Sequence, residues 1–273
     1  MHHELDIMQF AVIMDAMQEH GCRNVLIVIA HPDDESFGCG ALIAAEAAAR
    51  ARVVVCCASR GELGEDVSGR YQTRDALGVA REAELREAAE VLGVAEVELL
   101  GLTDSGRDGD PEPGSIVAEP SRLCALVSEV MVRHRPDVVV TLDPTGSDGH
   151  RDHAAVGRAT TVAFDDVVDW PAALYHWCLP HSLMDAWSRE IAAAEPDSVY
   201  LGTELGRADA DVTTVLDGAA VLDVVHRAVA AHRTQASPYA AVNAGLAERF
   251  MRFDHLVRQQ PAWDGGPAED RLR

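Results

Sequence analysis

The sequence contains no lysine, so all 23 of its basic residues are arginine, against 45 acidic residues and a formal net charge of −22. A surface this acidic repels phosphate backbones and anionic lipid headgroups, so we expect neither nucleic acid nor a membrane as a partner. No apolar run approaches the roughly 20 residues that span a bilayer. The first residues carry acids where a secretory signal needs basic and then apolar residues, so we expect a cytoplasmic protein.

Aromatic residues make up 5% of the chain, so a buried core must consist mostly of Val, Leu, Ile and Ala. The six cysteines form no C-x-x-C pair and have no disulfide-framework spacing. Cys56 and Cys57 lie within the apolar run VVVCCAS, which indicates buried thiols in a reducing compartment. No Ser/Gly tract, Pro-rich spacer or block of like charge separates two folded halves, so we expect one domain over residues 1–273.

Apolar runs alternate with amphipathic stretches over the first two thirds of the chain. We predict strands at 24–30, 52–59, 97–105 and 136–144, and helices at 38–51, 73–94 and about 121–134. Near-continuous Val/Ile runs separated by helices are typical of a parallel sheet that is covered on both faces. The pattern predicts an α/β, Rossmann-like three-layer fold with a mainly parallel sheet and an active site at the carboxyl-terminal rim of its strands.

The remaining third of the chain has a weaker pattern. We predict strands at 173–180 and 197–205, helices at 182–194 and 218–235, and further helical segments in the last forty residues. The core of the domain then covers about 22–165, and the part from about 166 to 273 extends the sheet and walls the site.

Two polar clusters directly follow predicted strands. The first, IAHPDDESFGCG, crowds His31, Asp33 and Asp34 against the end of a hydrophobic strand. The second, DPTGSDGHRDHAAVGRAT, spans 143–160 and carries His150 and His153, three residues apart at a helix start, so that their side chains point the same way. Because the carboxyl ends of parallel strands meet at one rim, the two clusters are expected to lie together.

Two neutral imidazoles and one carboxylate can hold a divalent metal and leave a position open for water. We assign His31, Asp34 and His153 as ligands, and a dication there offsets the charge crowding of neighbouring acids. The spare carboxylate of Asp33 can accept the proton of an activated water, and a protonated His150 can stabilise an oxyanion. If the assignment is correct, nitrogens of His31 and His153 lie within about 4 Å of one another.

Each motif alone has a simpler interpretation. HPDDE can be a turn that leads into a helix N-cap, since acids favour the first helical turn. His31 alone is more often a structural histidine, and H-x-x-H alone is commoner than metal sites. The presence of both clusters at the ends of predicted parallel strands favours the metal site.

The paired motifs also carry a resemblance. AHPDDES, followed about 120 residues later by GHRDHAAVG, resembles the LmbE-like, or PIG-L, family of zinc-dependent N-acetylglucosaminyl deacetylases, whose relatives serve mycothiol, bacillithiol and antibiotic pathways. The likeness extends through SRGELGE, REAELREAAEVLGVAEVELLGLTD and AAHRTQASP, and so covers most of the chain. It implies the same ligands, with zinc as the metal (Fe²⁺ or another divalent ion fits the same set), Asp33 as general base and His150 in the oxyanion role.

The resemblance also suggests substrate contacts and partners. It implies that Asp104, Arg70 and Arg81 hold sugar hydroxyls or phosphate, although each can equally form an internal salt bridge. It implies a small N-acetylated glycoside as substrate, with a homo-oligomer as one possible assembly. One departure is HRDH where the family usually reads HPDH: Arg151 removes a proline-fixed φ and adds a cation that can alter substrate preference. Its neighbour Asp152 can orient or tune a histidine.

We therefore predict that the protein removes an acetyl group from an N-acetylated amino sugar or its conjugate. One rival is amidase action on a thiol-sugar conjugate. A second is a non-haem Fe(II) oxygenase, which also uses two His and one carboxylate but commonly with H-x-D/E spacing on antiparallel barrels. A third is a non-catalytic sugar- or metal-binding module, which leaves Asp33 and His150 without a role. His232 and Gln235 can border the pocket or lie on the surface.

Overall fold

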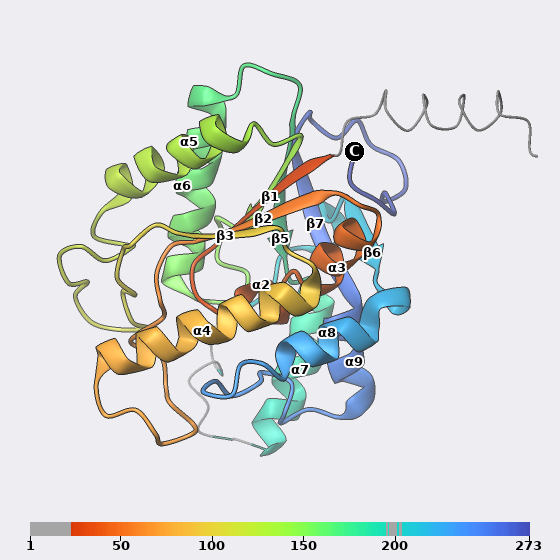
Figure 1. Cartoon of the computed structure of the whole chain (residues 1–273). Helices are drawn as coiled ribbons and strands as arrows, with labels where there is room; N and C mark the ends of the chain where they lie inside the picture. Colours follow the sequence, from red (N-terminus) through yellow and green to blue (C-terminus); the bar gives the residue numbers. More distant parts are fainter. Residues whose placement is uncertain (1–22, 195, 197–200, 202–203) are drawn as a thin grey trace, which may run out of the picture.

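The computed structural model describes residues 23–194, 196, 201 and 204–273. Within this part of the chain, seven strands form one sheet in the order β3-β2-β1-β4-β5-β7-β6 (Figure 1). Strands β1 to β5 are parallel, and β7 pairs antiparallel with both β5 and β6. The strands are β1 (Asn24–Ile29), β2 (Arg52–Cys57), β3 (Glu96–Leu99), β4 (Val138–Leu142), β5 (Ala173–Cys178), β6 (Thr214–Asp217) and β7 (Phe253–Gln260).

Helices cover both faces of this sheet. Figure 1 shows α5 and α6 on one side, and α3, α4 and α8 on the other. The helices are α2 (Asp34–Phe37), α3 (Gly40–Ala48), α4 (Arg74–Leu92), α5 (Pro120–His134), α6 (Arg151–Val167), α7 (His181–Ala194), α8 (Leu222–Val229) and α9 (Ala244–Arg252). The predicted α/β fold with a mainly parallel, doubly covered sheet is confirmed.

The central strands explain why the sheet forms. All five residues of β4, and all but the first of β1 and β2, are buried, as expected for strands with a helix layer on each face. The longest flanking helix, α4, starts where the Thr73 side chain accepts the Ala76 N–H at 3.2 Å, and ends at Gly93 in a left-handed conformation with φ 83°.

Strand order determines where the polar clusters lie. The chain runs outward from β1 through β2 to β3, then returns to place β4 on the other side of β1. The loops that follow β1 and β4 therefore diverge at adjacent strands, which is the switch point where open α/β sheets bind ligands. His31 follows β1, and the 143–150 loop follows β4.

Three expectations for the last third of the chain need comment. The helix expected at 218–235 is shorter, because α8 ends at Val229 and turns follow. Helical segments are expected in the last forty residues, and α9 is one at 244–252, but 253–260 form the strand β7. Buried Arg258, paired with Glu269 at 3.1 Å, interrupts the apolar pattern that marks a strand. Most of the strand expected at 197–205 lies outside the described residues.

Among the described helices, none combines the length and apolar character needed to cross a bilayer.

Asp254 of β7 is a buried carboxyl that links three elements. Its oxygens accept the Leu42 backbone N–H at 2.6 Å and the Trp177 indole N–H at 3.2 Å. Burial raises the pKa of Asp254 to about 7. Between the ordinary carboxyl pKa and this value, the folded chain keeps a proton that the unfolded chain releases, so a rise in pH favours unfolding there.

We expect the Asp254→Asn variant to lose this pH dependence. The free energy of unfolding of the wild type should fall relative to that of the variant by up to about 1.4 kcal/mol per pH unit between pH 4 and about 7, and no further above that range. Urea denaturation at several pH values measures this difference. A difference that is constant from pH 4 to 8 would contradict the assignment of a raised pKa to Asp254.

Candidate metal centre

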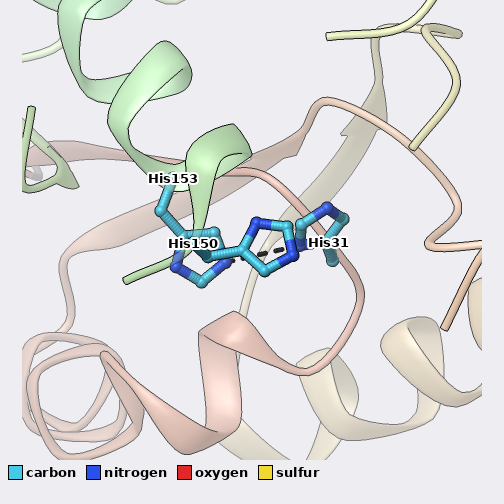
Figure 2. A group of neighbouring side chains, drawn as sticks. All are labelled: His31, His150 and His153. Carbon is cyan, nitrogen blue, oxygen red and sulfur yellow. Dashed lines mark hydrogen bonds between the residues drawn. The ribbon is translucent and has the colours of Figure 1, made fainter. Parts of the chain in front are cut away.

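His31 and His153 meet at the carboxyl edge of β1 and β4. The Nδ1 atom of His31 lies 3.3 Å from Nε2 of His153, inside the limit of about 4 Å expected for ligands of one metal. His31 follows the end of β1, and His153 lies in the first turn of α6 (Figure 2). The topology thus brings together two predicted ligands that are 122 residues apart.

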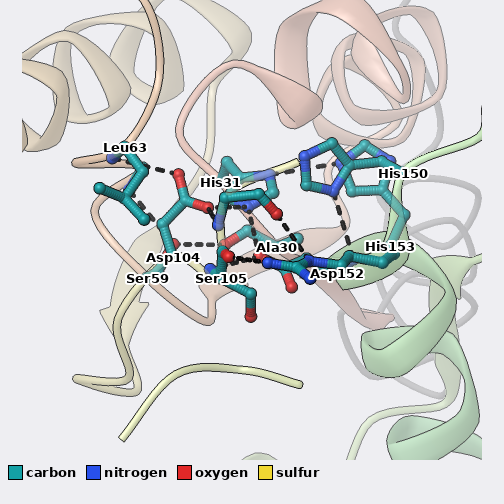
Figure 3. Close-up of polar contacts among 12 residues, drawn as sticks. Ala30, His31, Ser59, Leu63, Asp104, Ser105, His150, Asp152 and His153 are labelled. Atoms are coloured by element: carbon teal, nitrogen blue, oxygen red, sulfur yellow. Dashed lines mark hydrogen bonds and ion pairs between the residues drawn. The ribbon is translucent and has the colours of Figure 1, made fainter. Parts of the chain in front are cut away.

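The outer nitrogen of each ring is held by a carboxylate. His31 Nε2 lies 3.1 Å from Asp152 Oδ2, and His153 Nδ1 lies 2.5 Å from Asp148 Oδ2. Figure 3 shows Asp152 beside His31 and close to Ser105. Carboxylate partners of this kind fix the orientation and tautomer of metal-binding histidines and raise their basicity.

Asp34 completes the predicted ligand set from the first turn of α2. Its Oδ1 lies 3.2 Å from His153 Nε2. Its Oδ2 accepts the backbone N–H groups of Ala30 and His31 at 3.0 and 2.9 Å. One oxygen therefore anchors the carboxylate to the end of β1 and lies 4.0 Å from His31 Nδ1, and the other faces His153.

The donor atoms fit a divalent cation. Each imidazole donates its outer N–H to a carboxylate, so the inner nitrogens of His31 and His153 direct lone pairs at one another across 3.3 Å. Such lone pairs repel unless a proton or a metal ion lies between them. Ligands bonded to tetrahedral zinc at about 2.0–2.1 Å are about 3.3 Å apart, the separation found here.

The charges around the cluster also favour a cation. Four largely buried carboxylates border the two imidazoles: Asp34, Asp104, Asp148 and Asp152. Burial alone would lower the pKa of His31, but these carboxylates, Asp104 and Asp152 first, raise it to about 10. Burial likewise opposes protonation of His153, yet its carboxylate neighbours raise its pKa well above the ordinary value. A site that draws protons this strongly onto imidazoles is suited to bind a dication in their place.

His150 belongs to the same cluster but has a different environment. Its ring centroid lies 4.8 Å from those of His31 and His153, and the three rings offer nitrogens within 4.8 Å of one another (Figure 2). Burial, followed by the two neighbouring imidazoles, lowers the pKa of His150 to about 3. Its Nδ1 accepts the Asp152 backbone N–H at 3.2 Å, so the neutral ring carries its proton on Nε2.

Asp33 occupies a strained backbone conformation. Its φ of 117° lies in the left-handed region, which is unusual for a residue other than glycine. The Glu35 carboxylate accepts the Asp33 backbone N–H at 2.9 Å, and Arg81 donates to Asp33 Oδ2 at 2.9 Å. Burial raises the pKa of Asp33 to about 6, although Arg81 opposes the rise. A carboxyl with a pKa near neutrality is suited to proton transfer.

Glu35 is itself held by a residue from the end of the chain. Its Oε1 lies 2.6 Å from His232 Nε2, and both side chains are fully buried. Of the two placements considered for His232, the pocket border and the surface, the surface placement is wrong, because the side chain is fully buried against Glu35. The sequence gives no sign of this pairing, since the two residues are 197 positions apart.

The three predicted substrate contacts differ in position. Asp104 lies beside the cluster, with Oδ1 3.6 Å from His31 Nε2 and 2.7 Å from the Gly106 N–H that it accepts. Arg81 is buried, and its guanidinium is engaged by Asp33 and by backbone carbonyls, with NH2 2.6 Å from the oxygen of Pro32. Arg70 is exposed in the loop between β2 and α4. Their roles toward a substrate remain predictions.

Sequence reasoning did not identify Asp148 as a partner of the cluster. Asp148 lies in a polar, glycine-containing loop, and its contact with His153 depends on how that loop folds back after β4. The spacing of five residues between an acid and a histidine has no fixed geometry outside a helix, so the sequence pattern could not distinguish Asp148 from a solvated loop acid.

Comparison with known proteins identifies similar sequences. The PIG-L family, described as GlcNAc-PI de-N-acetylase, matches residues 26–164. A 1D-myo-inositol 2-acetamido-2-deoxy-alpha-D-glucopyranoside deacetylase from Kineococcus radiotolerans is 34% identical over 278 residues, covering 88% of this chain and 75% of the relative. A protein of the same description from Rhodococcus opacus is also 34% identical, covering 91% of this chain and 96% of its own length.

Solved structures share the fold at lower identity. The N,N'-diacetylchitobiose deacetylase of Pyrococcus horikoshii has a TM-score of 0.58 at 14% identity, with 94% of each chain covered. GalB, a 4-carboxy-2-hydroxymuconate hydratase from Pseudomonas putida, has a TM-score of 0.61 at 20% identity, covering 90% of this chain and 100% of its own. Since one neighbour is a hydratase, the fold alone does not specify the reaction.

We expect the Glu35–His232 pair to be essential for stability. Glu35→Met leaves His232 and the Asp33 N–H buried without an acceptor, which should lower the free energy of unfolding by about 3–5 kcal/mol. The matched control is Glu87→Met, which removes an exposed ion pair with Arg233 and should cost at most about 1 kcal/mol. Urea denaturation of both variants makes the comparison. Equal losses of unfolding free energy in the two variants would show that the buried pair stabilises the fold no more than the exposed pair does.

Proposed function

The chain belongs to the PIG-L family of de-N-acetylases, and from this premise we propose that its three-ligand centre removes the acetyl group from a 2-acetamido-2-deoxyglucopyranoside. The enzyme is a metal-dependent N-deacetylase. The observation that carries the proposal is the contact of His31 with His153 at 3.3 Å, together with a second carboxylate, Asp33, which lies next to Asp34 in the chain and is not needed as a ligand. Metal binding alone needs no such neighbour, whereas amide hydrolysis needs a base.

We assign the metal to His31 Nδ1, His153 Nε2 and Asp34 Oδ1, and identify it as zinc. Two imidazoles, one carboxylate and an open position are the usual donor set of catalytic zinc. When bound, the cation lowers the pKa of the attacking water and polarises the amide carbonyl. Asp34 is preferred to His150 as third ligand because Oδ1 lies 3.2 Å from His153 Nε2, while the Asp152 N–H already occupies His150 Nδ1.

Asp33 acts as the general base. Arg81 holds Oδ2, which leaves Oδ1 to accept a proton from the attacking water. The Asp33 side chain remains 18% exposed, whereas that of Arg81 is 4% exposed, so the carboxylate is the member of the pair that solvent can reach. The protonated carboxyl can then return the proton to the leaving amine, which would restore the base for the next cycle.

His150 donates a hydrogen bond to the developing oxyanion. The sequence motif predicts a cationic ring, but the backbone bond to Nδ1 favours the neutral tautomer with its proton on Nε2. A neutral N–H donor fixed in position stabilises an oxyanion without adding a second positive charge beside a dication. The N-cap position of α6 supplies that fixed orientation.

The substrate is proposed to be an N-acetylglucosaminyl inositol without a phosphate group. Support comes from the two relatives named for this activity, which match about nine tenths of the chain. The net charge of −22 disfavours a phosphorylated or membrane-bound glycoside, such as the one in the family description. Amidase action on a thiol conjugate and oxygenase chemistry have no comparable support.

Acetate release tests the function and the base together. We expect the zinc-loaded protein to release acetate from N-acetylglucosaminyl inositol with a kcat/KM higher than for N,N'-diacetylchitobiose. Asp33→Asn keeps an oxygen for Arg81 but cannot accept a proton, so kcat should fall by about 10²–10⁴-fold while zinc content stays unchanged. Asp110→Asn, in an exposed loop, serves as the matched control.

Two results would overturn the proposal. Full turnover by Asp33→Asn would remove Asp33 as the base. Cleavage of a cysteinyl amide by the wild type, with no acetate released from any N-acetylglycoside, would replace deacetylation with amidase chemistry.

A further inference from the structure

Arg151 directs its guanidinium to one loop of the protein. Its Nε donates to the Gly106 carbonyl at 2.7 Å, and NH1 donates to the Gly109 carbonyl at 2.6 Å. Its NH2 group donates to the carbonyls of Ser105 and Asp108. All three guanidinium nitrogens are therefore occupied by backbone of the Ser105–Gly109 loop, so the cation is not free to contact a substrate as the sequence analysis considered.

The same loop supplies two N–H groups to the metal centre. Ser105 N–H donates to Asp152 Oδ2 at 2.9 Å, and Gly106 N–H donates to Asp104 Oδ1 at 2.7 Å. Both carboxylates lie against His31 Nε2, at 3.1 and 3.6 Å (Figure 3). The loop thus orients the two acids that flank one proposed metal ligand.

One peptide group connects the two sets of contacts. The Ser105 carbonyl, which accepts from Arg151, and the Gly106 N–H, which donates to Asp104, belong to the same amide. A cation at the carbonyl end polarises the amide and strengthens the hydrogen bond that its N–H makes to a carboxylate. The guanidinium therefore strengthens the hydrogen bond that holds Asp104, which lies on the side of His31 opposite the proposed metal position.

The loop needs an external clamp because its own backbone provides little order. Gly106 and Gly109 have φ of 65° and 80°, and among the described residues no helix or strand lies between β3 and α5. An isolated bridge joins Thr103 to Ser115 outside the segment that Arg151 contacts. Arginine suits this task because its planar fork can bond several carbonyls at once, whereas lysine presents a single compact charge.

We propose that Arg151 is a positioning residue for His31, acting through the Ser105–Gly109 loop on Asp104 and Asp152. The inference rests on the proposed function in that it takes His31 as a metal ligand. Without the Arg151 contacts, the two carboxylates can move away from His31 Nε2. The His31 ring then loses its fixed orientation, so metal affinity and kcat both fall. The effect depends on the shape of the guanidinium and not on its charge alone.

The test compares Arg151→Lys and Arg151→Met with Arg122→Met, an exposed arginine of α5. Zinc affinity is measured by chelator competition, the Co²⁺ absorption spectrum reports ligand geometry, and kcat and KM are measured for acetate release. Both Arg151 variants should bind zinc about tenfold or more weakly, as for the loss of other outer-shell partners, with an altered Co²⁺ spectrum and a reduced kcat. The Arg122 variant should match the wild type.

Two outcomes would overturn the inference. Wild-type zinc affinity and Co²⁺ spectrum in Arg151→Lys would mean that charge suffices and the fork geometry is irrelevant. The same result in Arg151→Met, with only thermal stability reduced, would make Arg151 structural. The metal measurements decide this even if the wild type releases no acetate, so failure of the proposed reaction is distinguishable from failure of the clamp.

Discussion

The structure depends on one close approach: two imidazole nitrogens face each other at 3.3 Å while carboxylates hold the opposite edges of both rings. That arrangement is unfavourable unless a proton or a metal ion lies between the rings, so the site is suited to bind a cation. The position of this site follows from the strand order. Because β4 lies beside β1, the first turn of α6, which carries His153, lies next to His31 at the end of β1. Burying the surrounding carboxylates costs desolvation free energy, and their attraction to a bound cation offsets that cost.

The three consecutive acids of HPDDE have three separate environments. Asp34 is anchored by backbone N–H groups and faces His153, Asp33 is partly exposed beside Arg81, and Glu35 is fully buried against His232. The left-handed backbone at Asp33 allows adjacent side chains to diverge in this way, and the Glu35 bond to its N–H maintains that conformation. Backbone strain of this kind persists where the surrounding contacts hold the residue in place.

Much of this could be predicted from sequence, and the reasons are local. Runs such as NVLIVI and VVVTL specify buried parallel strands, and the polar clusters that follow them must share one rim. The contacts of Asp148, His232 and Arg151 could not be predicted, because each depends on how an irregular loop folds back over the sheet edge. β7 was missed because buried Arg258 pairs with Glu269 and conceals the strand pattern. The contact of His150 Nδ1 with the Asp152 backbone N–H could not be predicted for a similar reason, since it depends on how α6 is capped.

Anomalous diffraction at the zinc edge, from crystals of the metal-loaded protein, tests the central claim most directly. The account predicts one peak within about 2.0–2.2 Å of His31 Nδ1, His153 Nε2 and a carboxylate oxygen of Asp34. A peak on the other side of His31, between Asp104 and Asp152, or one bound by His150 in place of Asp34, would contradict it.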